Sequence, residues 1–129
     1  MPGYRSMDLS LGQAVLRGSF DTNNTSAPDG IRGTGFTVTR TGVGVFKIQL
    51  AYPPDYYAQF DSYDVKIHAQ GYTACVTAED SDDSAGPYIT VTTYDDEAAA
   101  GAGAAADTTD KKVTFWVAVR YGSAGIDGA

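Results

Sequence analysis

The sequence predicts an all-β protein that folds as a single-domain β-sandwich of about seven strands. Several segments alternate β-branched or aromatic residues with polar ones at a period of two, which is typical of half-buried strands. Glycine and other turn-forming residues separate these segments at the spacing expected for a sandwich or barrel. The chain has 129 residues, which is the usual size of one domain.

The clearest of these segments is GTGFTVTRTGVGVFKIQL, residues 33–50. Phe36 and Val38 share one face of its first strand, and apolar residues at alternate positions line its second strand. The connection, residues 41–44, contains two glycines that can adopt the positive φ of a short hairpin turn. Neither strand carries a nucleophile, a base or a set of metal ligands, so we expect a structural hairpin.

Five further strands are expected. They are residues 13–20, 64–70, 72–78, 88–94 and 111–121. The last of them also carries Trp116 and Ala118 on its second face, which indicates a central strand or one that is covered on both sides. In residues 54–60, Tyr56 and Phe60 are four positions apart and could share a short helical turn.

Composition and charge exclude several classes of protein. The formal net charge is −7 and the isoelectric point is near 4.3, without the basic stripe that a nucleic acid requires. No apolar run approaches the roughly 20 residues needed to cross a bilayer, and the first residues lack the apolar core of a secretion signal. The single cysteine cannot form an intrachain disulfide. We therefore expect a cytoplasmic fold without a nucleic-acid or membrane partner.

Enzymatic activity and a cofactor are not expected. The sequence has no phosphate-binding glycine loop, no metal-ligand spacing and a single histidine, His68. Cys75 would need a base to act as a nucleophile, and we interpret it as a small buried hydrophobic residue. Residues 21–30 and 79–84 suggest calcium because carboxylate and amide oxygens suit a hard cation. Neither segment has the twelve-residue calcium-loop pattern, and turn formation explains them better.

Two loops are unusual in composition. The first, within residues 51–64, gathers the aromatic residues Tyr52, Tyr56, Tyr57, Phe60 and Tyr63. Their rings either cap the open end of the sandwich or contact a partner, since tyrosine buries a large ring at low entropic cost. The second, residues 95–110, is rich in alanine and glycine. It could be a mobile surface loop, a short helix or a segment packed closely against a neighbouring subunit.

Three segments resemble small virion proteins of tailed bacteriophages. They are RGSF (17–20), GIRGTGFTVTRTGVGVFKIQLAYPPDY (30–56) and KKVTFWVAVR (111–120). The similarity covers most of residues 13–121, and the acidic and Ala/Gly loops are its least similar parts. Some proteins of this kind are head decoration, or cement, proteins. The shared hairpin is a fold signature and carries no catalytic residue to transfer.

The resemblance implies a structural role on the virion. We expect residues 1–12 to form an N-terminal arm and residues 13–129 to form a jelly-roll-like β-sandwich domain. The protein would be made in the cytoplasm of the host bacterium and would bind the major capsid protein on the outer capsid surface as a homotrimer. The residues expected to contact the capsid or a neighbouring protomer are Tyr4, Met7, Leu9, Leu11, Tyr52, Pro53, Tyr56 and Tyr57.

Three alternatives remain open. A tail- or fibre-associated virion protein would share the fold and the lack of chemistry. A carbohydrate-binding β-sandwich module would use the aromatic rings of the Tyr-rich loop as a sugar platform. An intracellular β-sandwich adaptor from a bacterium would neither bind phage capsids nor need symmetry.

Overall fold

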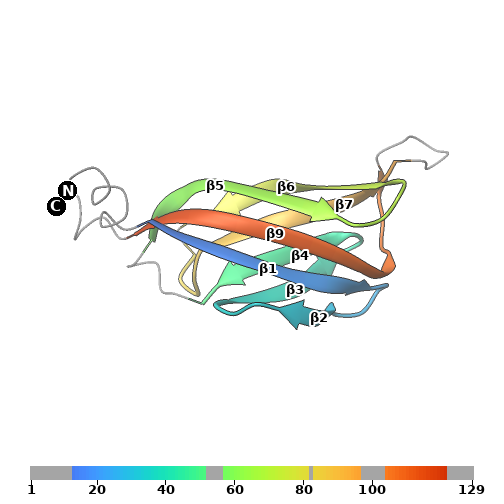
Figure 1. The fold of residues 1–129 in the computed structure, drawn as a ribbon, viewed down its shortest axis with the longest axis horizontal. Helices are drawn as coiled ribbons and strands as arrows, with labels where there is room; N and C mark the ends of the chain where they lie inside the picture. Colours follow the sequence, from blue (N-terminus) through green and yellow to red (C-terminus); the bar gives the residue numbers. More distant parts are fainter. Residues whose placement is uncertain (1–12, 52–56, 82, 97–103, 122–129) are drawn as a thin grey trace.

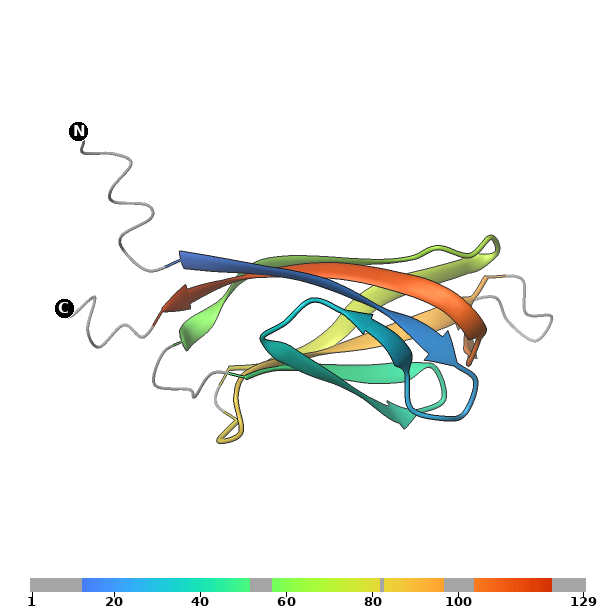
Figure 2. The same ribbon diagram turned by 60° about the horizontal axis from the view of Figure 1, so that its bottom comes forward.

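The computed structural model describes residues 13–51, 57–81, 83–96 and 104–121. This part of the chain contains nine strands and no helix. The strands are β1 (Gln13–Asn23), β2 (Asp29–Arg32), β3 (Phe36–Gly42), β4 (Val45–Leu50), β5 (Tyr57–Ile67), β6 (Tyr72–Asp80), β7 (Tyr88–Asp95), β8 (Ala104–Ala105) and β9 (Thr109–Tyr121). Two antiparallel sheets pack face to face, as Figures 1 and 2 show, and the predicted all-β sandwich is confirmed.

The strand order, which the sequence left open, is that of a Greek key. Sheet A has the order β2-β1-β9-β5, and sheet B has the order β3-β4-β7-β6 with β8 paired to β7. The neighbours β3-β4-β7-β6 correspond to one sheet of an immunoglobulin-type sandwich. The neighbours β5-β9-β1 of sheet A correspond to strands C, F and G of the other immunoglobulin sheet. β1 is the first strand of this chain, yet it occupies the position of G, the last strand of an immunoglobulin domain. Such an order defines a scaffold and does not by itself identify a function.

The core lies between the two sheets and consists of aliphatic side chains with two aromatic contacts across the gap. The ring of Phe20 in β1 lies 5.0 Å from that of Phe46 in β4, and the ring of Phe36 in β3 lies 4.9 Å from that of Phe115 in β9. Gly18 of β1 makes room for the second pair, because a Cβ there would lie 2.4 Å from a ring atom of Phe36. The inward residues of the predicted strands thus form the core, as the period-two pattern indicated.

All seven predicted strands are present, and β2 and β8 are additional. β9 lies between β1 and β5 at the centre of sheet A, as Trp116 and Ala118 indicated. In the predicted hairpin, strand pairing continues to Gly42, and the turn consists of Val43 and Gly44, of which Gly44 has a φ of 66°.

Two of the predictions about single segments are wrong. The described part of residues 54–60 is extended rather than helical, since it forms the start of β5 at Tyr57. Register shifts at 57/59 and 60/62 interrupt the alternation of this strand, so the sequence did not show a strand there. Cys75 is exposed rather than buried. It lies on the outer face of β6, the edge strand of sheet B, and pairs with Thr92 of β7.

The end of the Ala/Gly loop is held firmly against sheet B. The Ala106 N–H donates to the Thr93 carbonyl at 3.0 Å, and the Thr93 hydroxyl donates to the Ala106 carbonyl at 2.8 Å. The Asp107 carboxylate accepts two hydrogen bonds from Arg40 at 3.0 and 2.7 Å and one from the Gly44 N–H at 2.9 Å. Residues 104–108 are therefore an ordered part of the sandwich, whereas residues 97–103 lie outside the described residues.

Candidate functional site: the outer face of sheet A

The strand register arranges the outer face of sheet A in rows of side chains. Trp116 of β9 pairs with Arg17 of β1 on one side and with Asp64 of β5 on the other. Two residues further along each strand, Thr114 pairs with Ser19 and Lys66. Successive residues of a strand point to opposite faces, so these two rows stand on the same face. We call them the Trp116 row and the Thr114 row.

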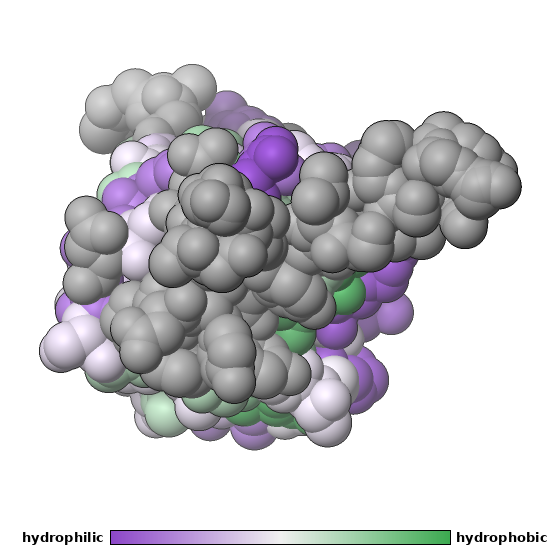
Figure 3. Space-filling model, turned by 90° about the vertical axis from the view of Figure 1, so that its left-hand side faces the viewer, coloured by the Kyte–Doolittle hydropathy of each residue, from purple (hydrophilic) through white to green (hydrophobic). Residues whose placement is uncertain are grey.

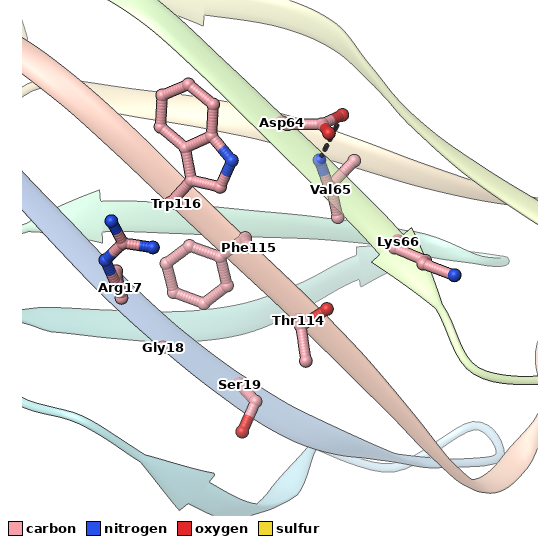
Figure 4. Close-up of a pocket in the computed structure, with 9 residues that line it drawn as sticks. All are labelled: Arg17, Gly18, Ser19, Asp64, Val65, Lys66, Thr114, Phe115 and Trp116. Carbon is pink, nitrogen blue, oxygen red and sulfur yellow. Dashed lines mark hydrogen bonds between the residues drawn. The ribbon is translucent and has the colours of Figure 1, made fainter.

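A shallow groove runs across the three strands between these rows. Its floor is the backbone at Gly18, Phe115 and Val65, which are neighbours in the register. These three positions belong to the inner face of sheet A, so the side chains of Phe115 and Val65 point into the core. The groove has a volume of about 360 Å³ and is lined by both rows and the floor. Figure 4 shows the residues of the two rows rising from β1, β9 and β5, with the indole of Trp116 on the side of β9 that faces β5.

The groove carries cations without an ion-pair partner. Among the described residues, Arg32, Arg40 and Arg120 each form an ion pair, with Asp21, Asp107 and Asp61 respectively. Arg17 and Lys66 form none within that part of the chain. The Asp64 carboxylate stands on β5, across β9 from Arg17 and two residues before Lys66, and it accepts a hydrogen bond from the Val65 N–H at 2.9 Å. The groove therefore offers charged donors and one fixed acceptor to a ligand.

The boundary of the groove is held by hydrogen bonds to neighbouring elements. The Ser19 hydroxyl accepts from Nε of Arg32 at 2.8 Å, and the Arg32 guanidinium also binds Asp21. The hydrogen bond from Arg32 to Asp21 holds the pKa of the Asp21 carboxyl below its usual value. On the other side, Nε2 of His68 lies 3.0 Å from the Thr114 hydroxyl. These contacts hold Ser19 and Thr114, whereas the cations Arg17 and Lys66 form no ion pair among the described residues.

Toward one end of the same face, two apolar residues stand in the row next to the Trp116 row, and the charged Arg120 stands in the row beyond them. Val15 of β1 and Ser62 of β5 flank Ala118 of β9. Val15 is 50% exposed and Ala118 is 4% exposed. This row lies toward the end of sheet A where β1 begins, β9 ends and β5 begins, since Gln13 pairs with Arg120 and Tyr57 pairs with Tyr121. Figure 1 shows the three strand ends together, and in Figure 3 hydrophobic and hydrophilic residues are interspersed around the grey atoms on this end.

The segments that contain the predicted contact residues adjoin described strand residues at this end of the sandwich. All but one lie outside the described residues, namely Tyr4, Met7, Leu9, Leu11, Tyr52, Pro53 and Tyr56. Tyr57 is the first residue of β5. The structure thus brings together the points where the N-terminal segment and the Tyr-rich segment join the sheet. Two other members of that segment, Phe60 and Tyr63, pack with ring centroids 6.1 Å apart, and Phe60 is buried.

The remaining candidates for chemistry are separated from one another. His68 follows β5 of sheet A, whereas Cys75 lies on β6 of sheet B. In the acidic loop, the Asp83 carboxylate accepts from the Gln49 amide at 2.8 Å. Residues 23–26 form a turn in which the Ser26 N–H donates to the Asn23 carbonyl. Within the described ranges, no three His, Cys, Asp or Glu residues are grouped so that they could hold a metal ion.

Comparison of the chain with protein-family models, curated proteins and solved structures gives no match. The resemblance to phage virion proteins therefore stays a prediction. In the part of the chain that the structure describes, no helix is long and apolar enough to cross a membrane.

The sequence did not reveal the groove. Its six wall residues come from three segments that are about 50 residues apart in the chain, and only the register brings them together. One signal was present, since an aromatic residue on the second face of the last strand is unusual for a solvent-facing position. Trp116 thus indicated that the second face of the last strand is covered, but the sequence did not show which residues of β1 and β5 stand beside the indole.

Proposed function

We propose that this protein is a phage capsid decoration, or cement, protein that binds the outer capsid surface as a trimer and stabilises the head. The observation that carries the proposal is the convergence of three strand ends on one end of sheet A, next to the exposed Val15. Residues 1–12 and the Tyr-rich segment both join the sheet there. A single partner surface could therefore contact both segments at once.

Such a role needs binding and no chemistry. A trimer on a local three-fold axis presents three copies of the same contact, so that weak individual contacts combine through a high effective concentration. The sandwich would serve as a rigid support that holds the contact segments at one end. Stabilisation of the head then follows from bridging several copies of the major capsid protein.

The test is binding of purified protein to purified capsids after removal of residues 1–11. Because β1 begins at Gln13, the truncation leaves every described strand intact, and we expect lost capsid binding with an unchanged thermal unfolding transition. Full binding by the truncated protein would contradict the role of the arm.

A matched pair of substitutions tests which end of the molecule docks. Val15→Asp changes a valine that is 50% exposed beside the converging strand ends, and Val43→Asp changes one that is 56% exposed in the β3–β4 turn. Burying a carboxylate in an apolar contact is costly. We therefore expect Val15→Asp to weaken capsid binding and Val43→Asp to leave it unchanged, and the reverse result would place the docking surface elsewhere.

A tail- or fibre-associated virion protein would use the same converging end. Electron microscopy of particles that carry a labelled protein distinguishes the two locations. Label on the capsid faces is the expected result, and label confined to the tail would replace the decoration role by the tail role.

A further inference from the structure

We propose that the groove between the Trp116 row and the Thr114 row binds a carboxylated saccharide, with a pyranose ring against Trp116 and its carboxylate at Arg17. Trp116 and Arg17 are direct neighbours in the register. One ligand can thus meet an apolar aromatic surface and a guanidinium together. Arginine is well suited to a carboxylate because its planar donors form two parallel hydrogen bonds.

Charge complementarity favours an anionic ligand. The protein as a whole has a net charge of −7, yet Arg17 and Lys66 stand in the groove without an ion-pair partner among the described residues. Lys112 stands on the same face one row beyond Thr114, where it pairs in the register with Asp21. The groove thus holds two cations and one carboxylate, Asp64, and its remaining positive charge on an acidic molecule favours an anionic ligand.

The polar groups of the groove suit sugar hydroxyls. A hydroxyl both donates and accepts, so a ring with several hydroxyls needs donors and acceptors close together. Lys66 supplies donors, the Asp64 carboxylate supplies an acceptor, and the Thr114 hydroxyl, which also contacts Nε2 of His68, adds a further polar group. The hydrogen bond from the Val65 N–H to Oδ1 of Asp64, drawn in Figure 4, fixes that carboxylate in position. A carboxylate accepts more than one hydrogen bond, so Asp64 keeps acceptor capacity for a ligand.

The dimensions favour a small ligand over an extended peptide. The two rows are two residues apart along each strand, which is about 7 Å, and the volume of about 360 Å³ is at the lower end of the range for small-molecule sites. A peptide gains affinity on a sheet chiefly by adding a strand to a free edge. The floor of this groove is backbone of β1, β9 and β5, and β9 is paired on both sides.

This inference is independent of the capsid proposal. It concerns the isolated protein and the middle of the outer face of sheet A, whereas capsid docking concerns the end of that sheet. Loss of either activity leaves the other to be measured separately. It also differs from a sugar platform on the Tyr-rich loop, because none of the aromatic residues of that loop lines the groove.

The chain offers a direct probe, because Trp116 is its only tryptophan. We would titrate the full-length protein with trigalacturonate and follow the tryptophan fluorescence. The controls are the methyl ester of the same trisaccharide, which lacks the charges, and a triglutamate peptide, which has the charges without the sugar. We expect a saturable change with trigalacturonate and binding at least tenfold weaker for both controls.

Variants assign the binding to the groove. Arg17→Gln is expected to weaken trigalacturonate binding roughly tenfold, because a hydrogen-bonded charge pair is lost. Lys47→Gln removes the same charge from sheet B, where Lys47 lies over the Tyr88 ring at 4.3 Å, and should bind normally. No saturable change with trigalacturonate would overturn the proposal. Equal binding of the triglutamate peptide, or equal loss in both variants, would also overturn it.

Discussion

At the scale of single residues, Gly18 decides how closely the two sheets approach. A Cβ at this position would lie 2.4 and 2.6 Å from two ring atoms of Phe36 and 2.9 Å from a ring atom of Phe115. Both rings belong to the edge-to-face pair that joins β3 to β9. A larger residue can be accommodated only if these buried rings move out of their packing.

We therefore expect Gly18→Ala to lower the free energy of unfolding by about 1–3 kcal/mol, the usual cost of overpacking a core. Gly42→Ala is the matched control, because its Cβ would meet nothing closer than 3.9 Å. Urea unfolding of the two variants and the parent measures both effects. Equal stability of Gly18→Ala and the parent would mean that the ring pair is not as tightly packed as the distances indicate.

Asp107 is the residue that fixes the end of the Ala/Gly loop to sheet B. Its side chain is 11% exposed and binds both Arg40 and the Gly44 N–H. We expect Asp107→Ala to destabilise the protein, with the unsatisfied Gly44 N–H alone costing roughly 1–3 kcal/mol. Asp21→Ala removes the partner of a more exposed arginine and should cost less. Thermal unfolding of the two variants provides the comparison.

The same residue predicts a dependence of stability on pH. The hydrogen bond from Arg40 is the main cause that holds the pKa of the Asp107 carboxyl below its usual value. A lowered pKa in the folded state stabilises the fold above the pKa of the unfolded chain, near 3.9. That stabilisation is lost as the pH falls further, through the folded pKa. We expect the parent to lose stability below about pH 4 more steeply than Asp107→Ala, and parallel curves would contradict this.

At the scale of strands, the period-two pattern predicted the strands that have one face on the core and one face toward solvent. β4 alternates buried and more exposed residues along its whole length, β3 alternates less and more exposed ones, and β7 and β9 alternate over part of their length, and the sequence showed all four. β2 is exposed at all four positions and β8 is a pair of alanines, so neither has a pattern to read. The start of β5 was missed because its two register shifts reverse the alternation.

β6 shows the limit of the pattern in another way. An edge strand has one face on the core and one open to solvent, so a small residue such as Cys75 fits either face. The structure places it outside. We expect Cys75 of the native protein to react fully with a thiol reagent without denaturant, as measured by absorbance of the released thiolate. Reaction that requires denaturant would restore the buried interpretation.

At the scale of the whole molecule, the order of strands creates the features that the sequence could not predict. β1 and β9 are the first and last strands, yet they pair along ten positions, and β5 joins β9 on its other side. This arrangement assembles the groove from three distant segments. It also gathers the starts of β1 and β5 and the end of β9 at one end, where the contact segments attach.

The trimer is the prediction that belongs to this scale. If three copies sit around a local three-fold axis, identical contacts between protomers are formed three times, and the assembly should survive moderate dilution. The native mass across a dilution series is expected to stay at three times the chain mass of 13.6 kDa. The control is the chain without residues 1–11, whose strands are all retained, and which tests whether the arm takes part in the contact. A strict monomer at every concentration would remove the three-fold argument, because docking at one end of sheet A would then have to supply the whole affinity through a single contact.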